Sequence, residues 1–587
     1  MEQKVLKASA VSPSIRVADV QFNTKAHLFE IERAIGDGVD LLVFPRLSLC
    51  GCTCADLFFQ PTLVKACEES IQTLATATKN SKTLVIVGSP VLKDGVLYDS
   101  AVALFNGGVL ATVFNPTLTE EERRWFENGE QTQPLIEALG VKIAVCFEES
   151  EVRTDAEIIV HMPASFELVR LARRRREWLK KTAYETPCAC VSVCPNIGES
   201  STDGVYSSHA LIVSEGEVLE EALPFASGRA TATMDISALQ NARRQRILRR
   251  YPVKEEKTLF SSPFLPTEEE KEEYCQTAME IQAQGLARRL RQIGAKTAVI
   301  GVSGGLDSTL ALLVIARAFD ILGKDRREII GITMPGFGTT GKTYQNALKL
   351  IQTIGATLRE IPIADSVRVH FKDIGHDGKK TDAAYENAQA RMRTLILMDV
   401  ANMENGIVVG TGDLSELALG WCTYNGDHMS MYSFNASVPT TLVKYLVAYA
   451  AEQTNGELQE ALLSVVNTEI SPELLPPDAK GNIAQKTEDL VGPYELHDFY
   501  LYHAIYNRLA PKEVFSLAKA AFEGKYTDET LKKWLKNFYR RFFTQQFKRS
   551  CSPDGVQVTC LSLSPRGGFK MPSDGVGALW LNEAENL

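Results

Sequence analysis

The sequence lacks any apolar run that approaches the roughly 20 residues a helix needs to cross a bilayer. Its first residues are not followed by the apolar core of a secretory signal peptide. These absences argue against a helical membrane span and against secretion. We therefore expect a cytoplasmic protein without a membrane partner.

Positive charge is also in short supply. Lysine and arginine number 63 against 73 aspartates and glutamates, which gives a formal net charge of −10. Such a chain has no global attraction to a phosphate backbone. Nucleic-acid binding is therefore not expected as its main role.

Metal-binding and disulfide patterns are missing as well, although the chain has 12 cysteines. No pair of CxxC motifs is present, and none of the 8 histidines is spaced to complete a zinc site. Cys188, Cys190 and Cys194 alternate as side chains do along a strand. We interpret the cysteines as reduced thiols that serve as small hydrophobic side chains.

What the sequence does contain is the pattern of an α/β protein, and its 587 residues suggest about two to four domains. Short apolar runs alternate with charged, helical stretches over the first part of the chain. These runs lie at residues 41–44, 84–87, 143–145 and 158–160. Residues 251–266 are polar and marked by prolines, which predicts a linker between one domain at residues 1–250 and another at residues 267–587.

The second domain contains a glycine-rich loop at residues 301–308 (GVSGGLDS), which follows an apolar strand at residues 298–302 and opens a helix. The glycines let the backbone approach a ligand, and the first helical amides favour an anion. Ser303 and Ser308 add hydroxyl donors, and Asp307 makes sense if it holds Mg²⁺ on phosphates. No lysine follows the glycines, which excludes the GxxxxGK[ST] loop. The pattern predicts a pyrophosphate-binding loop.

The stretch SGGLDS resembles the motif of the N-type ATP pyrophosphatases, which activate a carboxylate or carbonyl as an adenylate. Over essentially its whole length, the second domain resembles the synthetase domain of the glutamine-dependent NAD⁺ synthetases. The segments that carry this resemblance are residues 334–340, 385–391, 410–416, 420–421, 424–427, 471–474, 485–489 and 546–551. The resemblance implies an adenine-nucleotide α-hydrolase-like fold, which is a doubly wound parallel sheet.

The resemblance also implies the reaction. The nicotinate carboxylate of deamido-NAD⁺ attacks the α-phosphorus of ATP and displaces pyrophosphate, which gives an adenylate. Ammonia then displaces AMP to leave the amide. By position, Asp307 and Glu416 would be catalytic residues that hold Mg²⁺. ATP and pyrophosphate would be bound by Ser303, Gly304, Gly305, Ser308 and Thr411, and deamido-NAD⁺ by Arg391, Trp421, Asp427 and Lys548. A fixed cation with aimed amides suits the charge that accumulates on pyrophosphate.

One position departs from the family's pattern. In residues 437–444 (SVPTTLVK) the family usually has a lysine directly after the proline, whereas this chain has Thr440. A hydroxyl cannot supply the charge of a lysine, and Lys444 lies about one helical turn further on. We expect slower adenylation rather than its loss.

The first domain resembles, more loosely, the nitrilase-type glutaminase that accompanies this synthetase, which is an α-β-β-α sandwich. The resemblance rests on residues 40–51, 124–126 and 198–203. Such domains release ammonia from glutamine with a glutamate base, a lysine that stabilises the oxyanion, and a cysteine nucleophile.

Only the cysteine of this triad is clearly present. Cys146 falls at the place of the nucleophile, after a strand. Arg46 stands at the place of the base and cannot accept a proton. The position of the lysine falls on Asn115, or on Ala111 if the alignment has no gap. Because the members of such a triad act as a unit, we predict an inactive glutaminase.

Other interpretations of this site remain open. The site is rewired if Glu148 or Glu149 serves as the base and Arg46 as the oxyanion donor. A misplaced alignment would hide an intact triad. A cation at Arg46 near Cys146 would lower the pKa of the thiol and make it reactive, although a buried structural thiol is favoured.

The sequence thus predicts an NAD⁺ synthetase that aminates deamido-NAD⁺ with free ammonia and retains a nitrilase-like domain for structure, assembly or regulation. One alternative is a working glutamine-dependent synthetase. Another is a nucleotide-binding pseudoenzyme or regulatory subunit. The resemblance also implies a homo-oligomer, either a dimer of synthetase domains or a larger assembly.

Overall fold

The structure is a computed structural model that describes residues 4–244, 251, 261–338, 341–468 and 487–587. The chain divides into two compact units: unit 1 consists of Met1–Ser200 and Val205–Glu255, and unit 2 of Ser201–Gly204 and Glu256–Leu587. Of the expected linker, residues 252–260 lie outside the described residues, as do the motif residues 339–340, 471–474 and 485–486. No described helix is both long and apolar enough to cross a membrane.

Unit 1 contains two six-stranded sheets. The first sheet has the order β12 (Arg229–Asp235), β1 (Val5–Val11), β2 (Leu41–Val43), β3 (Leu84–Lys93), β4 (Val96–Phe105) and β5 (Gly108–Phe114). The second has the order β11 (Glu217–Ala222), β10 (Ala210–Ser214), β9 (Ala189–Val193), β8 (Ile158–His161), β7 (Val141–Cys146) and β6 (Ile136–Ala138). The central pairs β1–β2, β2–β3, β7–β8 and β8–β9 are parallel.

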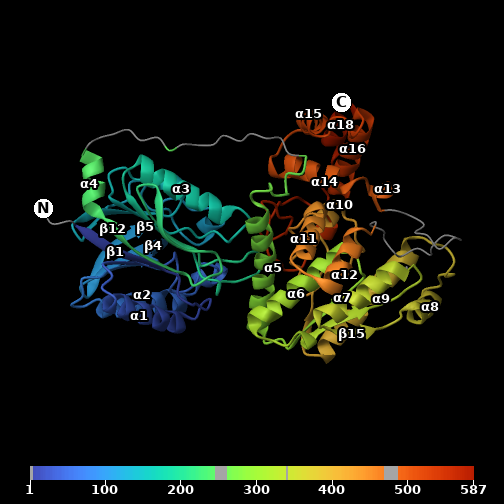
Figure 1. Ribbon diagram of the computed structural model, residues 1–587, viewed down its shortest axis with the longest axis horizontal. Helices are drawn as coiled ribbons and strands as arrows, with labels where there is room; N and C mark the ends of the chain where they lie inside the picture. Colours follow the sequence, from blue (N-terminus) through green and yellow to red (C-terminus); the bar gives the residue numbers. More distant parts are fainter. Residues whose placement is uncertain (1–3, 245–250, 252–260, 339–340, 469–486) are drawn as a thin grey trace. The chain divides into compact units, whose positions relative to one another are not determined.

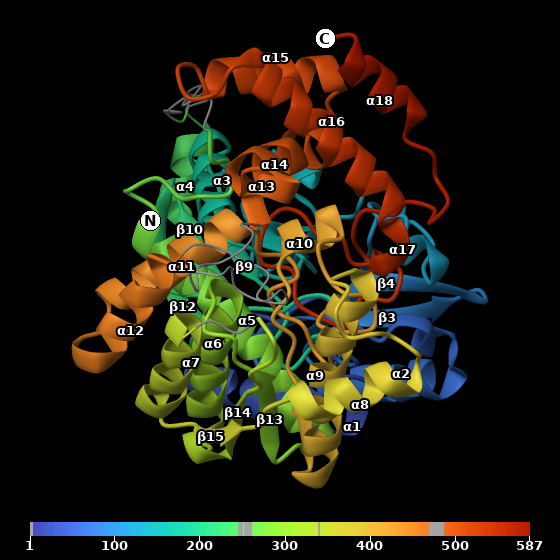
Figure 2. The same ribbon diagram turned by 90° about the vertical axis from the view of Figure 1, so that its right-hand side faces the viewer.

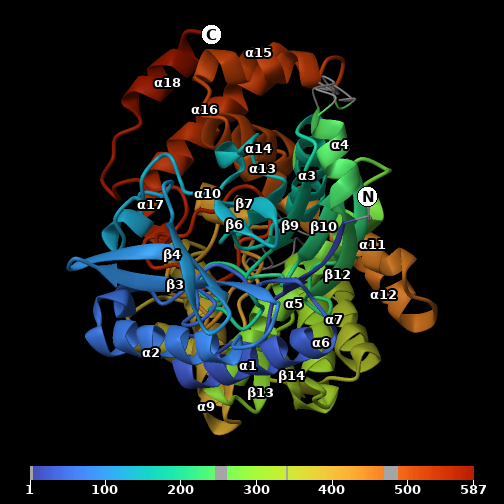
Figure 3. The same cartoon turned by 90° about the vertical axis from the view of Figure 1, so that its left-hand side faces the viewer.

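Helices cover the outer faces of the two sheets (Figures 1 and 3). The helices of unit 1 are α1 (Val20–Gly36), α2 (Pro61–Ala77), α3 (Leu171–Glu185) and α4 (Ile236–Arg244). On β2, Leu41 and Val43 face the core between the sheets, whereas Leu42 faces the core beneath α1 and α2. Both faces of the strand are buried, which explains its continuous apolar run. The expected nitrilase-like α-β-β-α sandwich is confirmed.

Unit 2 is built on a parallel four-stranded sheet (Figure 2). Its order is β15 (Thr357–Glu360), β14 (Ile329–Thr333), β13 (Thr297–Gly301) and β16 (Gly406–Val408). On one face, Ile330 and Ile332 of β14 pack with residues of α8 (Ala364–Asp373) and α9 (Ala383–Met403). Helices α6 (Leu306–Leu322) and α7 (Gly341–Ile354) also contact the sheet, and Gly331 approaches Ile351 of α7. The expected doubly wound parallel sheet is confirmed.

Further helices complete unit 2. Around the sheet lie α5 (Lys271–Ile293), α11 (Thr440–Glu452) and α12 (Gly456–Val466), which pack on α6 and α7. A second apolar core is formed mainly by α10 (Leu414–Leu419), α14 (Tyr494–Tyr500), a π-helical turn (Leu501–Tyr506), α15 (Pro511–Ala521) and α16 (Asp528–Thr544). The remaining helices are α13 (Thr487–Val491), α17 (Gln546–Arg549) and α18 (Ala578–Glu585).

Candidate active site

The glycine-rich loop connects the end of β13 to the start of α6, as the sequence indicates. Gly304 has a φ of +86°, and a Cβ at this position would lie 2.1 Å from the carbonyl oxygen of Thr343. Only glycine fits such a position. Gly305 is the N-cap of α6, so the first amides of a 17-residue helix face this loop. The loop is therefore suited to bind an anion.

The two predicted serines meet within this loop. The hydroxyl oxygen of Ser303 accepts a hydrogen bond from the amide of Gly305 at 3.1 Å and lies 3.1 Å from the hydroxyl of Ser308. The Ser308 hydroxyl donates to the carbonyl of Gly305 at 3.2 Å. Ser303 is exposed, so its hydroxyl is accessible to a ligand.

Three carboxylates gather beside the loop. Asp413 caps α10: its Oδ1 accepts from the amide of Glu416 at 2.7 Å, and Glu416 Oε2 accepts from the amide of Asp413 at 3.3 Å. Burial raises the pKa of Asp307 to about 6. Burial also raises the pKa values of Asp413 and Glu416, and the negative charges of the other carboxylates add to this rise. This concentration of negative charge favours a bound cation.

The donor set fits Mg²⁺ held jointly with phosphate oxygens. Asp307 Oδ1 is buried and has no hydrogen-bond partner within the described residues. In the same part of the chain, no three His, Cys, Asp or Glu side chains are placed to hold a metal ion by themselves. Mg²⁺ commonly takes one or two protein carboxylates and completes its shell with water and substrate phosphates. Sequence reasoning assigned no role to Asp413, although its Asp-x-x-Glu spacing is that of a capping box.

Thr440, the departure from the family's pattern, contacts this carboxylate group. It is the first residue of α11 and is buried, with 5% of its surface exposed. Its hydroxyl donates to Asp413 Oδ2, and its amide donates to the hydroxyl of Ser415 at 2.9 Å. The side chain at the position after the proline therefore points at the carboxylates, whereas Lys444 is exposed to solvent.

Replacing Thr440 by lysine is expected to raise the rate of pyrophosphate release about 10-fold, equivalent to roughly 1.4 kcal/mol of transition-state stabilisation. The ammonium would lie beside Asp413, where it can offset the charge that accumulates on the phosphates. Rapid-quench measurement of pyrophosphate checks this. Thr440→Val, which keeps the shape and loses the hydroxyl, should not accelerate the step. A Thr440→Lys variant slower than the original would show that the hydroxyl is the better partner.

The four residues predicted to bind the dinucleotide either contact residues 420–428 or belong to that segment. Lys548 Nζ donates to the carbonyls of Gly420 and Cys422, at 2.7 Å each. Arg391 donates through Nε and Nη2 to the carbonyl of Tyr424, at 3.2 Å each. The other two contacts belong to the segment itself: Asp427 Oδ1 accepts from the amide of Thr423 at 2.8 Å, and the Trp421 ring lies 5.2 Å below the Arg541 guanidinium. The structure thus brings together residues that are up to 157 positions apart (548 minus 391).

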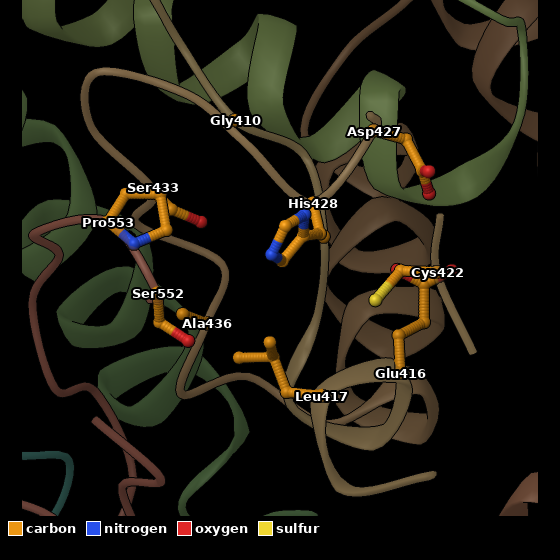
Figure 4. Close-up of a pocket in the computed structure, with 11 residues that line it drawn as sticks. Gly410, Glu416, Leu417, Cys422, Asp427, His428, Ser433, Ala436, Ser552 and Pro553 are labelled. Atoms are coloured by element: carbon orange, nitrogen blue, oxygen red, sulfur yellow. The ribbon is translucent and has the colours of Figure 1, made fainter. Parts of the chain in front are cut away.

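A pocket that is partly open to solvent lies against this segment (Figure 4), with about 400 Å³ of empty space when the solvent at its mouth is included. Its walls are formed by Gly410, Gly412, Glu416, Leu417, Cys422, Asp427, His428, Ser433, Ala436, Ser552 and Pro553. Glu416 lines this pocket and is also one of the three carboxylates beside the glycine-rich loop. The pocket therefore adjoins the predicted metal site. Sequence reasoning missed Cys422 and His428, because a lone cysteine or histidine carries no local pattern.

In unit 1, Arg46 is the centre of a buried ion-pair cluster. It follows β2 and has 1% of its surface exposed. Its Nε donates to Asp99 Oδ2 on β4 at 2.5 Å, and its Nη2 donates to Glu122 Oε1 at 2.6 Å. Asn115, which follows β5, donates from Nδ2 to the same oxygen of Asp99 at 2.8 Å. The two substituted triad positions therefore share one carboxylate, whereas Ala111 packs against the core between the sheets.

Cys146 ends β7 as a buried thiol. Its Sγ donates to the main-chain oxygen of Glu148 at 2.7 Å. Burial raises the pKa of Cys146, and the charge of Glu151 raises it further. This direction is opposite to the one expected if Arg46 lowered the pKa of the thiol, and the Arg46 guanidinium is paired with Asp99 and Glu122. A buried thiol that donates to a main-chain oxygen is typical of a structural cysteine.

A nitrilase-like sandwich joined to a doubly wound sheet with an anion-binding loop defines a class of two-domain proteins, and both parts match family models. Residues 7–244 match the family model described as carbon-nitrogen hydrolase. Residues 278–543 match the model described as NAD synthase. The chain belongs to the family of glutamine-dependent NAD⁺ synthetases, which are ligases.

The similarity to known proteins extends over nearly the full length of the chain, both in sequence and in structure. The chain is 32% identical to a glutamine-dependent NAD⁺ synthetase of Mycobacterium leprae, covering 99% of this chain and 98% of that protein. It is 26% identical to one of Aquifex aeolicus, over 94% and 97% of the two chains. The crystal structure of a glutamine-dependent NAD⁺ synthetase from Cytophaga hutchinsonii has the same fold, with a TM-score of 0.80 at 19% identity and coverage of 99% and 100%.

Proposed function

We propose that this chain converts deamido-NAD⁺ to NAD⁺ at the expense of ATP, through an adenylate, and that its nitrogen comes from free ammonia. One observation carries the proposal. An anion-binding loop, a carboxylate group and an adjoining pocket come together in unit 2, while the positions of the glutaminase base and lysine are occupied by Arg46 and Asn115.

In the adenylation step, the residues of unit 2 bind and orient the phosphates. The amides at the start of α6 and the hydroxyls of Ser303 and Ser308 would hold the departing pyrophosphate. Asp307 and Glu416 would hold Mg²⁺, which when bound offsets the charge on the phosphate oxygens. Thr411, in the loop before α10, would lie beside ATP. A solved relative from Acinetobacter baumannii carries ADP.

In the amidation step, the pocket would hold the activated carboxyl group of the dinucleotide next to incoming ammonia. Glu416 places this pocket beside the proposed metal site, so the adenylate need not move between the two steps. Arg391, Trp421, Asp427 and Lys548 surround the same segment and would fix the dinucleotide. We also propose a homo-oligomer, on the family resemblance alone.

The choice of free ammonia rests on unit 1. Glutamine hydrolysis requires a group that takes the thiol proton and a cation that neutralises the oxyanion. Arg46 cannot accept a proton, and its charge is already committed to Asp99 and Glu122. Asn115 is neutral, and the thiol of Cys146 donates to a carbonyl rather than to a base.

A second candidate is a glutamine-dependent synthetase with a rewired site. Two observations favour it: the relatives named above are glutamine-dependent, and burial raises the pKa of Glu148, as a general base near neutral pH would need. The contact of Cys146 with Glu148 is made by the main-chain oxygen, however, and not by the carboxylate.

A comparison of nitrogen sources tests the proposal. Purified chain is supplied with ATP, Mg²⁺, deamido-NAD⁺ and either ammonium chloride or glutamine, and NAD⁺ is measured. We expect NAD⁺ formation with ammonium and a glutamine rate lower by about 10³-fold or more, as for loss of a triad member. Cys146→Ala should leave the ammonium rate unchanged. Efficient use of glutamine that Cys146→Ala abolishes would establish the second candidate instead.

A further inference from the structure

Asn435 lies in the chain between Ser433 and Ala436, two residues that line the pocket (Figure 4). It is fully buried, with 0% of its surface exposed. Its Nδ2 donates to the main-chain oxygen of Asp307 at 3.2 Å and to that of Thr411 at 3.1 Å. One side-chain amide therefore joins the first turn of α6 to the loop that precedes α10.

The other end of this amide is fixed as well. Asn435 Oδ1 accepts a hydrogen bond from Gln282 Nε2 of α5 at 2.8 Å, and the same nitrogen of Gln282 donates to the Phe434 carbonyl at 3.3 Å. Both hydrogens of the Asn435 amide are thus used, and its oxygen has a donor. Gln282 Oε1 is buried without a partner in the described structure, so the fully paired member of this network is Asn435 itself.

The two segments that Asn435 joins bear the proposed Mg²⁺ ligands. Asp307 supplies a carboxylate from α6, and Glu416 supplies one from α10, more than 100 positions later in the chain. Each is fixed locally, Glu416 by the capping box with Asp413 and Asp307 by its place in the first turn. Neither local arrangement sets the separation between the two carboxylates. The parallel pairing of β13 with β16 brings the two segments to the same edge of the sheet, and the Asn435 amide then joins their backbones directly.

The residues that follow Asn435 hold α10 in a similar way. Thr440 donates to Asp413, and both the amide and the hydroxyl of Thr441 donate to Asp498 Oδ2, at 3.0 and 2.6 Å. Asp498 also accepts from the Ser415 hydroxyl at 2.5 Å. These contacts all lie on the α10 side. Of the described hydrogen bonds made by the side chains of residues 435–441, the one that reaches α6 is the bond from Asn435 to the main-chain oxygen of Asp307.

We infer that Asn435 is a positioning residue that sets the separation between the Asp307 and Glu416 carboxylates and thereby controls the adenylation step. This inference rests on the proposed function of unit 2. It assigns to Asn435 no contact with substrate. It predicts that a loss of the two amide donors changes the Mg²⁺ requirement and kcat, and leaves the KM for deamido-NAD⁺ nearly unchanged.

Two variants of the full chain test the inference. Asn435→Leu has a similar size and lacks both donors, and Asn435→Asp keeps the acceptor for Gln282 while presenting a carboxylate to two carbonyl oxygens. Pyrophosphate release is measured with ATP and deamido-NAD⁺ over a range of Mg²⁺ concentrations. In both variants we expect kcat to fall by about 10²-fold, as for a misplacement near 1 Å, with half-saturation at higher Mg²⁺.

Ser437→Ala is the matched control. Ser437 is two residues away, is also buried at 2% exposure, and bonds to the Leu561 carbonyl and the Val558 amide rather than to the two loops. Its kcat and Mg²⁺ half-saturation should stay at the original values even if its melting temperature falls. The inference is overturned if folded Asn435 variants keep both values, or if Ser437→Ala loses as much. If the original chain itself releases no pyrophosphate, the proposed function fails instead.

Discussion

Replacing Asp307 by asparagine is expected to lower the rate of pyrophosphate release by about 10³-fold, because the change removes a proposed Mg²⁺ ligand where charge accumulates in the transition state. One oxygen of this carboxylate, Oδ1, is buried and accepts no hydrogen bond in the described structure. The amide is isosteric, so the loop between β13 and α6 should keep its geometry.

The stability of the same variant should move in the opposite direction. Beyond the effect of burial, the charge of Asp307 raises the pKa values of both Asp413 and Glu416, so in the absence of a cation these carboxylates repel. Asparagine removes one of these charges, and we expect a melting temperature without Mg²⁺ that is unchanged or higher. Asp320→Asn, on the exposed side of the same helix and paired with Arg326, is the control and should keep full activity. An Asp307→Asn variant that keeps the original rate would contradict the proposal that Asp307 is a Mg²⁺ ligand.

The second large effect concerns the stability of unit 1. Replacing Arg46 by methionine is expected to reduce the free energy of unfolding of this unit by about 3–5 kcal/mol, the usual result of removing one partner from a buried ion pair. Asp99 would lose its cation while its Oδ1 already lacks a partner in the described structure, and Glu122 would lose the other guanidinium contact. Denaturant unfolding followed by signals from unit 1 measures the change.

A matched variant and a rescue make this test specific. Arg124→Met removes an arginine of the same domain that pairs with Asp56 at the surface, and it should change stability little. Adding Asp99→Asn to Arg46→Met removes the uncompensated charge and should recover part of the loss. An Arg46→Met chain as stable as the original would show that Arg46 does not hold the cluster together.

The fold was predictable where the pattern is local. Residues 41–44 and 158–160 are continuous apolar runs because each strand is buried on both faces, and they appear as β2 and β8. The anion-binding loop was found from its glycines and the flanking strand and helix, with β13 displaced by one residue from the expected range. Family resemblance supplied the rest of the α/β assignment.

The chemistry of the sites was less predictable than the fold, because it depends on contacts between segments that are far apart in the sequence. Arg46 meets Asp99 and Glu122 across 53 and 76 positions, and no spacing rule predicts such a cluster. The alternative of a reactive Cys146 considered the charge of Arg46 without these two partners, whereas the favoured interpretation was a buried thiol, and Cys146 is buried. Asn435 likewise reaches Asp307 across 128 positions, through a side chain that looks like an ordinary loop asparagine.

The source of the nitrogen is the point on which the account depends most, and one competition experiment decides it. The original chain is given ATP, Mg²⁺ and deamido-NAD⁺ with equal concentrations of ¹⁵N-labelled ammonium and unlabelled glutamine, and the isotope content of the NAD⁺ amide is measured by mass spectrometry. The account predicts an amide that carries ¹⁵N in nearly every molecule, with no release of glutamate. An amide that carries mainly ¹⁴N, accompanied by one glutamate for each NAD⁺, would contradict it.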